Sequence, residues 1–123
     1  MKTIHKIIVD RKSSYSLSYL SVKTEAEIKA GVNYLKNDKK LKKATHNSYA
    51  FRYQNSTQII EGKNDDGEKG AGNIILNYLQ NNNLNSLLVV VSRYYGGIKL
   101  GADRFKNIQK TLDLFFKDNK LKN

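Results

Sequence analysis

Residues 87–105 read Leu-Leu-Val-Val-Val-Ser-Arg-Tyr-Tyr-Gly-Gly-Ile-Lys-Leu-Gly-Ala-Asp-Arg-Phe, and this stretch decides the fold. It begins with five consecutive apolar residues, three of them β-branched, which is the pattern of a strand buried on both faces. A loop with three glycines and several basic residues follows. A strand, a glycine-rich loop and a helix in this order often present backbone N–H groups to a ligand, so the first hypothesis for the loop is anion binding.

A helix is predicted directly after this loop. Its apolar residues step by three, four and three positions, as one face of a helix requires: Phe105, Ile108, Leu112 and Phe115. Asp103 lies in the first turn, where a carboxylate complements the helix dipole but would repel an anion. Cations complement the other end of the dipole, and three lysines supply them: Lys117, Lys120 and Lys122.

Three further strands are expected before this stretch. Residues 4–9 are mostly apolar, and residues 14–22 alternate between serine and larger apolar side chains. Residues 44–53 end in alternating aromatic residues, which is again the period of a strand. The alternation favours strands that pack one face on a core and are paired antiparallel.

Two further helices lie between these strands. Thr24 and Glu27 form a capping box that begins the first, which should end near Asn37. The second is expected to begin near Gly70, whereas residues 54–69 are polar and are predicted as a long loop. The order β-β-α-β-α-β-α predicts an α+β fold, with the helices packed on one face of a sheet.

The length and composition predict one domain spanning residues 1–123, large enough to bury a core. Cysteine is absent, which excludes disulfides and thiolate chemistry. No apolar run approaches the roughly 18 residues of a membrane span, and the basic start of the chain develops no signal peptide. A cytoplasmic protein without a membrane partner is therefore expected.

The formal net charge of +11 indicates an acidic partner, of which nucleic acid is the usual one. Five lysines within residues 36–43 could face phosphates. The alternative is a solvated helix end, since no aromatic residues interleave these lysines as a stacking platform requires. Lysine far outnumbers arginine and proline is absent, so the codon bias of an AT-rich coding sequence also explains the basic charge.

Three carboxylates lie within four residues of this basic chain: Asp65, Asp66 and Glu68. Their spacing does not match an EF-hand, and magnesium would need a phosphate ligand in addition, so no metal or cofactor is predicted. His46 is a candidate base, but a lone histidine is more often a hydrogen-bonded structural group. Without a convincing nucleophile, no catalytic residue and no enzyme activity are predicted.

The acidic residues and the arginines are expected to form ion pairs that stabilise the fold. We expect Asp65, Asp66 or Glu68 to pair with Arg93 or Arg104 and so to tie the long loop to the glycine-rich loop. Bidentate pairs of this kind are favourable when they are partly shielded from water. The adjacent glycines at 96 and 97 would then provide a positive φ or a close backbone approach.

Residues 44–52, 65–72 and 89–105 together resemble the three signatures of the IMPACT family, whose bacterial relatives are the YigZ-type proteins. Residues 103–105, Asp-Arg-Phe, are similar to the eukaryotic form of the motif. The resemblance implies a ribosomal-protein-S5-domain-2-like fold. It also implies a shared binding surface formed by the motif residues: His46, Asn47, Tyr49, Arg52, Asp65, Asp66, Glu68, Arg93, Tyr94, Tyr95, Gly96, Gly97, Lys99, Gly101, Asp103 and Arg104.

The resemblance further implies a regulator of translation. Eukaryotic members of the family bind the ribosome-associated activator of the starvation-responsive kinase that phosphorylates initiation factor 2, and they restrain this kinase. They also associate with actin. The kinase-related binding is attributed largely to an N-terminal RWD domain, which has no counterpart in these 123 residues.

Three functional hypotheses follow. In the first, the chain is an interaction module of translation control that binds a protein partner or the ribosome and needs no catalytic group. In the second, it is an RNA-binding domain that uses Lys99, Arg93, Arg104 and the lysines within 36–43 on phosphates. In the third, it is an enzyme on a phosphorylated ligand, with residues 96–101 holding the anion, but this loop does not match a P-loop.

Overall fold

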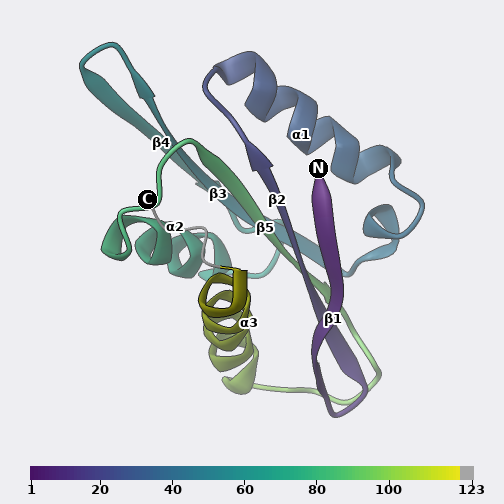
Figure 1. Cartoon of the computed structure of the whole chain (residues 1–123). Helices are drawn as coiled ribbons and strands as arrows, with labels where there is room; N and C mark the ends of the chain where they lie inside the picture. The colour runs from purple at the N-terminus through teal and green to yellow at the C-terminus, as the bar shows by residue number, and fades with distance from the viewer. Residues whose placement is uncertain (120–123) are drawn as a thin grey trace.

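The computed structural model describes residues 1–119 and shows a five-stranded antiparallel sheet with helices on both of its faces (Figure 1). The spatial order of the strands is β1-β2-β5-β3-β4. Their bounds are β1 (Lys2–Asp10), β2 (Ser13–Ser21), β3 (His46–Asn55), β4 (Gln58–Asn64) and β5 (Leu87–Tyr94). The helical elements are α1 (Glu25–Asn37), the 3-10 helix η1 (Leu41–Lys43), α2 (Ala71–Asn81) and α3 (Asp103–Asn119). The predicted α+β class is confirmed.

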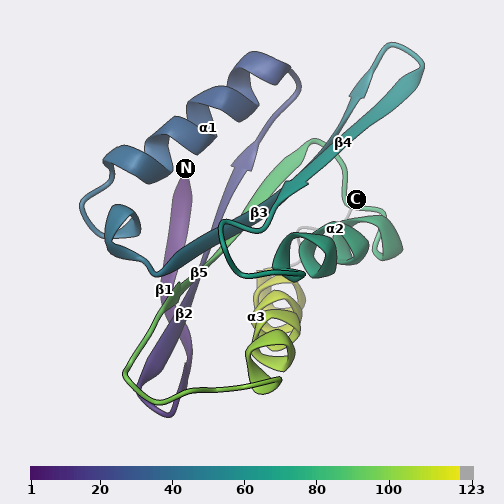
Figure 2. The same cartoon turned by 180° about the vertical axis from the view of Figure 1, so that it is seen from behind.

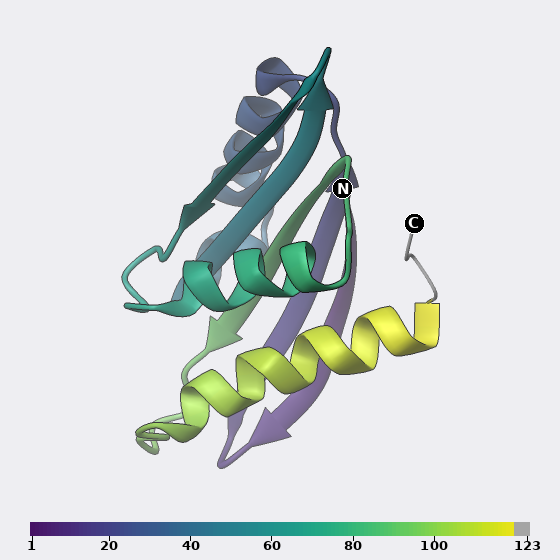
Figure 3. The same cartoon turned by 90° about the vertical axis from the view of Figure 1, so that its left-hand side faces the viewer.

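The central strand β5 is buried on both faces, as its unbroken apolar run predicts. Leu87, Val89 and Val91 belong to the core formed with α2 and α3. Leu88 and Val90 belong to a second core formed with α1. Figure 3 shows α1 behind the sheet and α2 and α3 in front of it. The prediction that the helices pack on one face is therefore wrong, because a strand that is apolar on both faces needs a cover on each.

The strand β4 lies where a loop was predicted, and that prediction is wrong over Gln58–Asn64. The sequence of β4 is polar because this edge strand has only β3 beside it and is largely exposed to water. Gly62, which weakens a strand pattern, lies against the ring of Phe51 on β3. A Cβ atom at Gly62 would come within 2.3 Å of the Phe51 Cζ atom.

The helices begin and pack largely as the sequence predicts. Thr24 Oγ1 accepts the N–H of Glu27 at 3.2 Å, which is the first half of the capping box at the start of α1. In α3, the predicted apolar face is buried at Ile108, Leu112 and Phe115. Lys117 lies in the last turn of α3, whereas Lys120 and Lys122 lie outside the described residues. No helix within residues 1–119 has both the length and the apolar character that a bilayer crossing needs.

Most of the motif residues meet at one end of the sheet. Because β3 and β5 are antiparallel, the first residue of β3, His46, lies opposite Arg93 near the end of β5. The connection from β5 to α3 leaves this end and runs past the turn between β1 and β2 (Figure 2). The segment between β4 and α2 reaches the same end, since its Asp66 hydrogen-bonds to the start of β3. This convergence creates the candidate site.

Candidate functional site

A buried carboxylate between two arginines is at the centre of this end of the sheet. Glu68 is only 4% exposed. Arg93 donates from Nε to Glu68 Oε2 at 2.7 Å and from Nη2 to Oε1 at 3.2 Å, while Arg104 Nε lies 3.2 Å from the same Oε1. We call these three residues the arginine–glutamate cluster. The cluster joins β5 and the first turn of α3 to the segment before α2, which confirms the expected pairing for Glu68.

The other two acids do not pair with these arginines. Asp65 caps α2, since its carboxylate accepts the N–H groups of Gly70 at 3.0 Å and Gly72 at 2.8 Å. The N–H groups of Gly70 and then of Gly72 hold the pKa of Asp65 below its ordinary value. Asp66 Oδ2 accepts the backbone N–H of Asn47 at 2.7 Å. Each carboxylate therefore has its own structural role.

His46 and Asn47 connect the start of β3 to its surroundings. His46 Nδ1 lies 2.7 Å from the backbone carbonyl oxygen of Asp66. Asn47 donates from Nδ2 to the carbonyl of Leu41 at 2.8 Å and accepts a hydrogen bond from Ser92 Oγ. One imidazole nitrogen is thus occupied by a backbone contact, which is the role expected of a structural histidine.

Tyr49 and Arg52 lie away from the cluster. Arg52 pairs in register with Leu87, at the opposite end of β5, and donates from Nε to Glu61 Oε2 at 2.7 Å. Tyr49 packs against the core on the α1 face, where burial raises its pKa. The structure therefore does not place these two residues on one surface with Arg93.

The loop between β5 and α3 is held close to the sheet by backbone contacts. The N–H of Tyr95 donates to Thr45 Oγ1 at 2.9 Å, and the N–H of Gly96 donates to Ser13 Oγ at 3.0 Å. Gly96 approaches the β1–β2 turn so closely that a Cβ atom would lie 2.1 Å from the Lys12 carbonyl oxygen. Gly97 has φ +96°. The expected close approach and positive φ are both confirmed.

The same loop exposes apolar side chains. Tyr95 is 46% exposed and Ile98 is 44% exposed, and Lys99 beside them is exposed too. The Arg93 guanidinium lies 5.8 Å from the centre of the Tyr95 ring. We call residues 95–101 the motif loop. It is anchored at one end by Arg93 and at the other by Arg104, so its exposed residues are displayed from a fixed base.

Asp103 has a partner that sequence reasoning missed. Arg11, in the turn between β1 and β2, donates from Nη2 to Asp103 Oδ2 at 2.6 Å and to Asp10 Oδ2 at 3.0 Å. This contact ties the start of α3 to the β1–β2 turn. A single arginine in a turn carries no signal of so distant a partner. Thr45, which accepts the N–H of Tyr95, lies inside the first motif, residues 44–52, but a threonine there carries no signal of this contact.

The contacts at this end of the sheet indicate that Arg93 and Arg104 have a structural role and do not bind an anion. A shallow hollow is lined by Glu68, Arg93, Lys99 and Arg104 together with parts of the motif loop. The Glu68 carboxylate already occupies the position between the two guanidinium groups that an anion would need. Within residues 1–119, no group of three or more histidine or acidic side chains is arranged to hold a metal ion.

The sequence of this chain matches a known protein family. A family model described as the Impact N-terminal domain matches residues 11–115, which include all three motifs. The fold is thus that of an Impact N-terminal domain. The chain belongs to the IMPACT family, as the resemblance of its motifs predicts.

Curated relatives match most of this chain. Protein IMPACT-B of Xenopus tropicalis and Protein IMPACT of Danio rerio are each 42% identical over 103 residues, which is 82% of this chain and 32% of each relative. Protein IMPACT of Homo sapiens is 39% identical over 103 residues, with the same coverage. The chain spans about a third of the length of the curated relatives that it matches.

Two solved structures resemble the fold. One, described as the two-domain translational regulator Yih1, is 33% identical, with a TM-score of 0.65 over 90% of this chain and 44% of that protein. The other, described as a hypothetical protein, is 25% identical, with a TM-score of 0.78 over 94% of this chain and 56% of that one.

Proposed function

We propose that the chain is a non-enzymatic interaction domain of translation control that binds a protein partner with the motif loop. The observation that carries this proposal is the exposure of two apolar side chains, Tyr95 and Ile98, on a loop whose two ends are held by ion pairs with Glu68. Exposed apolar and aromatic residues on a fixed loop are typical of protein contacts.

The partner class comes from the relatives. A solved relative is described as a translational regulator, and it shares the fold at 33% identity. The finer form of the proposal is that the motif loop engages the ribosome-associated activator of the initiation factor 2 kinase and thereby restrains that kinase. The motif acids and His46 are engaged in structural contacts. We therefore assign them no catalytic role, and binding to a protein partner needs none.

The test compares two double variants in affinity capture from the native cytosol, with nuclease present. The variant Tyr95→Ala/Ile98→Ser removes the exposed apolar groups of the motif loop. The control Tyr34→Ala/Ile59→Ser makes the same two changes at residues that are 40% and 50% exposed on α1 and β4. We expect the wild type and the control to retain ribosomal proteins or the kinase activator, and the motif-loop variant to lose them.

A cellular measurement tests the finer form. During amino-acid starvation, overexpression of the wild type should lower the phosphorylation of initiation factor 2, whereas the motif-loop variant should not. Equal capture by both double variants would contradict docking through the motif loop. Unchanged phosphorylation with intact capture would contradict only the link to the kinase.

RNA binding is the second candidate function, and fewer basic residues are free for it than the sequence suggests. Arg93 and Arg104 face Glu68 and are not free for phosphates, so this candidate depends on the exposed lysines after α1, such as Lys39 and Lys42. It predicts that capture of ribosomal proteins is lost with nuclease and weakens steeply with added salt.

A further inference from the structure

The α1 face of the sheet carries a hollow on the side away from the motif loop. Tyr94 follows Arg93 directly in β5, so their side chains point to opposite faces of the sheet. Helix α1 covers only part of this face, and within residues 1–119 no helix lies on this face over the lower part of β1 and β2 in Figure 1. A hollow of about 450 Å³ lies there. It contains Ser14, Ser16 and Tyr94 and is bordered by four basic side chains: His5, Lys6, Lys40 and Lys43. We call it the basic pocket.

Small side chains on β2 create this hollow. The residues of β2 that face α1 are Ser14, Ser16 and Ser18 and then Leu20, and Val22 follows just after the strand. Leu20 and Val22 belong to the core that α1 covers. Serine leaves room where leucine or valine would fill it. Ser14 and Ser16 therefore line the bottom of an open depression.

The strand β1 is distorted beside the pocket. Ile4 pairs with Leu17 and Ile8 with Tyr15, so the three residues 5–7 lie opposite the single residue Ser16. Within this bulge Lys6 has φ +53°, which is uncommon for a residue with a side chain, and its N–H donates to Ser16 Oγ at 3.2 Å. Bulges re-aim side chains next to binding sites, and this one brings both His5 and Lys6 to the pocket.

The pocket is strongly basic. Three lysines and a histidine border it, and none of the acidic side chains within residues 1–119 lines it. The acid that acts electrostatically on both His5 and Tyr94 is Asp38. Its carboxylate is already satisfied, since it accepts the N–H groups of Lys40 and Leu41 and the hydroxyl of Tyr34 at 3.0–3.1 Å. The lysine ammonium groups therefore remain available to an anion.

One side of the pocket is aromatic and fixed. The hydroxyl of Tyr94 donates to the backbone carbonyl of Lys40 at 3.0 Å, which holds the ring against the segment that carries Lys40 and Lys43. Most of the surface that lines the pocket is carbon, from this ring and from the lysine stems. A ligand that combines an anionic group with a flat apolar body matches both properties.

We propose that the basic pocket binds a nucleoside phosphate. The lysines and the Ser14 hydroxyl would contact the phosphate group, and the base would pack on the Tyr94 ring. A free nucleotide and one unit of a single-stranded RNA present this same chemistry. The site lies on the opposite face of β5 from the arginine–glutamate cluster, so it is independent of protein docking by the motif loop.

The first test titrates the wild-type chain at low salt with AMP, with inorganic phosphate and with a short single-stranded RNA, by calorimetry and by amide chemical shifts. We expect AMP to bind on the order of tenfold more tightly than inorganic phosphate, as one base–aromatic stack provides. The amide signals of Lys6, Ser16 and Lys40 should shift. Phosphate binding as tight as AMP binding, or shifts confined to other elements, would overturn the proposal.

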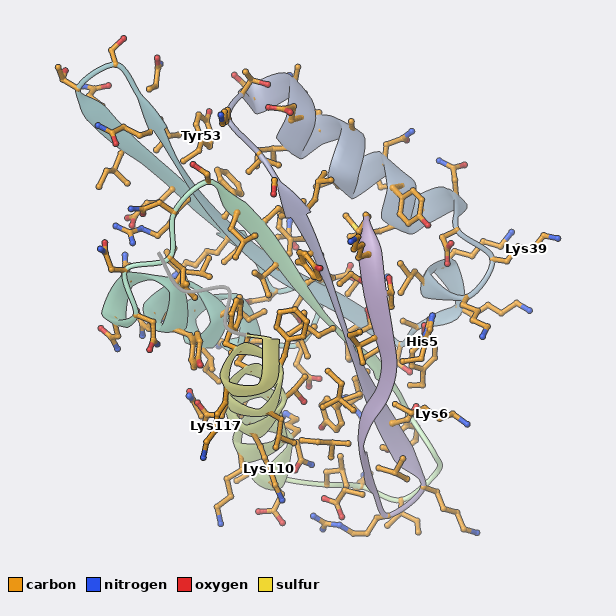
Figure 4. The ribbon with its side chains drawn as sticks, viewed as in Figure 1. His5, Lys6, Lys39, Tyr53, Lys110 and Lys117 are labelled. Carbon is orange, nitrogen blue, oxygen red and sulfur yellow. The ribbon has the colours of Figure 1, made fainter. Side chains whose placement is uncertain are left out.

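Variants then locate the site. Lys40→Ala/Lys43→Ala should weaken AMP binding by on the order of tenfold or more, since two charged contacts are lost. The control Lys110→Ala/Lys117→Ala removes the same charge from α3, which Figure 4 shows on the other side of the molecule from Lys6. Ser14→Leu should abolish binding by filling the hollow without a change in charge. If both double variants weaken binding equally, the attraction is general and the proposal fails.

The RNA arm separates the two sources of the ligand. RNA that binds more tightly than AMP, and loses this advantage in Lys40→Ala/Lys43→Ala, supports a strand as the natural ligand. AMP that binds at least as tightly as RNA supports a free nucleotide. Absence of binding by both AMP and RNA at low salt would refute the site. The amide shifts of the wild type locate the bound ligand, so the proposal can be tested even if Ser14→Leu does not fold.

Discussion

Glu68 and Arg93 lie 25 positions apart in the sequence and form a bidentate ion pair, with Arg93 Nε 2.7 Å from Glu68 Oε2 and Nη2 3.2 Å from Oε1. The side chains are only 5% and 11% exposed, respectively. Burying charges is costly unless each finds its partner, and here two hydrogen bonds and a second arginine satisfy the carboxylate. The pair therefore links the segment before α2 to β5 in one defined arrangement.

Removal of the Glu68 charge should destabilise the fold. In Glu68→Gln, Arg93 stays nearly buried without a counter-charge, and we expect the free energy of unfolding to fall by about 3 kcal/mol. Urea unfolding followed by circular dichroism measures this. The control Glu25→Gln breaks an exposed pair with Lys29 and should cost under about 0.5 kcal/mol. Equal losses in the two variants would contradict a structural role for the cluster.

The two adjacent glycines of the motif loop should respond differently to alanine. In Gly96→Ala the new Cβ would meet the backbone of Lys12 at 2.1 Å, and backbone cannot move away easily, so we expect a loss of at least about 2 kcal/mol. Gly97→Ala meets no atom within 4 Å, and its cost is the positive φ alone, about 1 kcal/mol. Thermal unfolding ranks the variants. A larger loss at Gly97 would contradict the close approach.

The elements with a strong periodic pattern could be predicted from the sequence. The apolar run of β5, the alternation of β2, the capping box of α1 and the helical spacing of α3 each act locally, and the structure has an element at each place. The pairing of Glu68 with the arginines could also be predicted from the sequence, because a few acids in a basic chain are expected to pair with basic residues. Its exact geometry could not, since it depends on how three elements meet.

The predictions that were wrong concern features that depend on tertiary contacts. The strand β4 has little apolar sequence because it is an edge strand, and it is held by pairing with β3 and by the Phe51–Gly62 contact. Arg52 belongs to the same motif as His46, yet six residues of extended chain carry it to the other end of the sheet. Closeness in sequence does not ensure a shared surface along a strand.

The contact between Phe51 and Gly62 gives a test of β4. In Gly62→Ala, the new methyl group must displace the Phe51 ring, which lies 2.3 Å from the ideal Cβ position, and we expect a loss of about 1 kcal/mol. In a Phe51→Leu background the same substitution should cost less, because the obstructing ring is absent. A double-mutant cycle by urea unfolding measures the coupling. Additive losses would mean that the two residues do not contact each other.

The cap that Asp65 provides to α2 predicts a pH dependence of stability. The carboxylate accepts two backbone N–H groups, and the amide of Asp65→Asn can accept only with its single oxygen, so we expect a loss of about 1 kcal/mol near pH 7. Because the contacts with Gly70 and Gly72 lower the pKa of Asp65 from its ordinary value of 3.8, the stabilisation is complete above that value.

As the pH falls below about 3.8 and through the lowered pKa of the folded state, Asp65 is protonated and its advantage over asparagine disappears. Urea unfolding of the wild type and of Asp65→Asn across this range measures the difference between their free energies of unfolding. We expect this difference to be constant near neutral pH and to shrink in acid. A difference that stays the same down to the acid range would show that the charge of Asp65 does not stabilise α2.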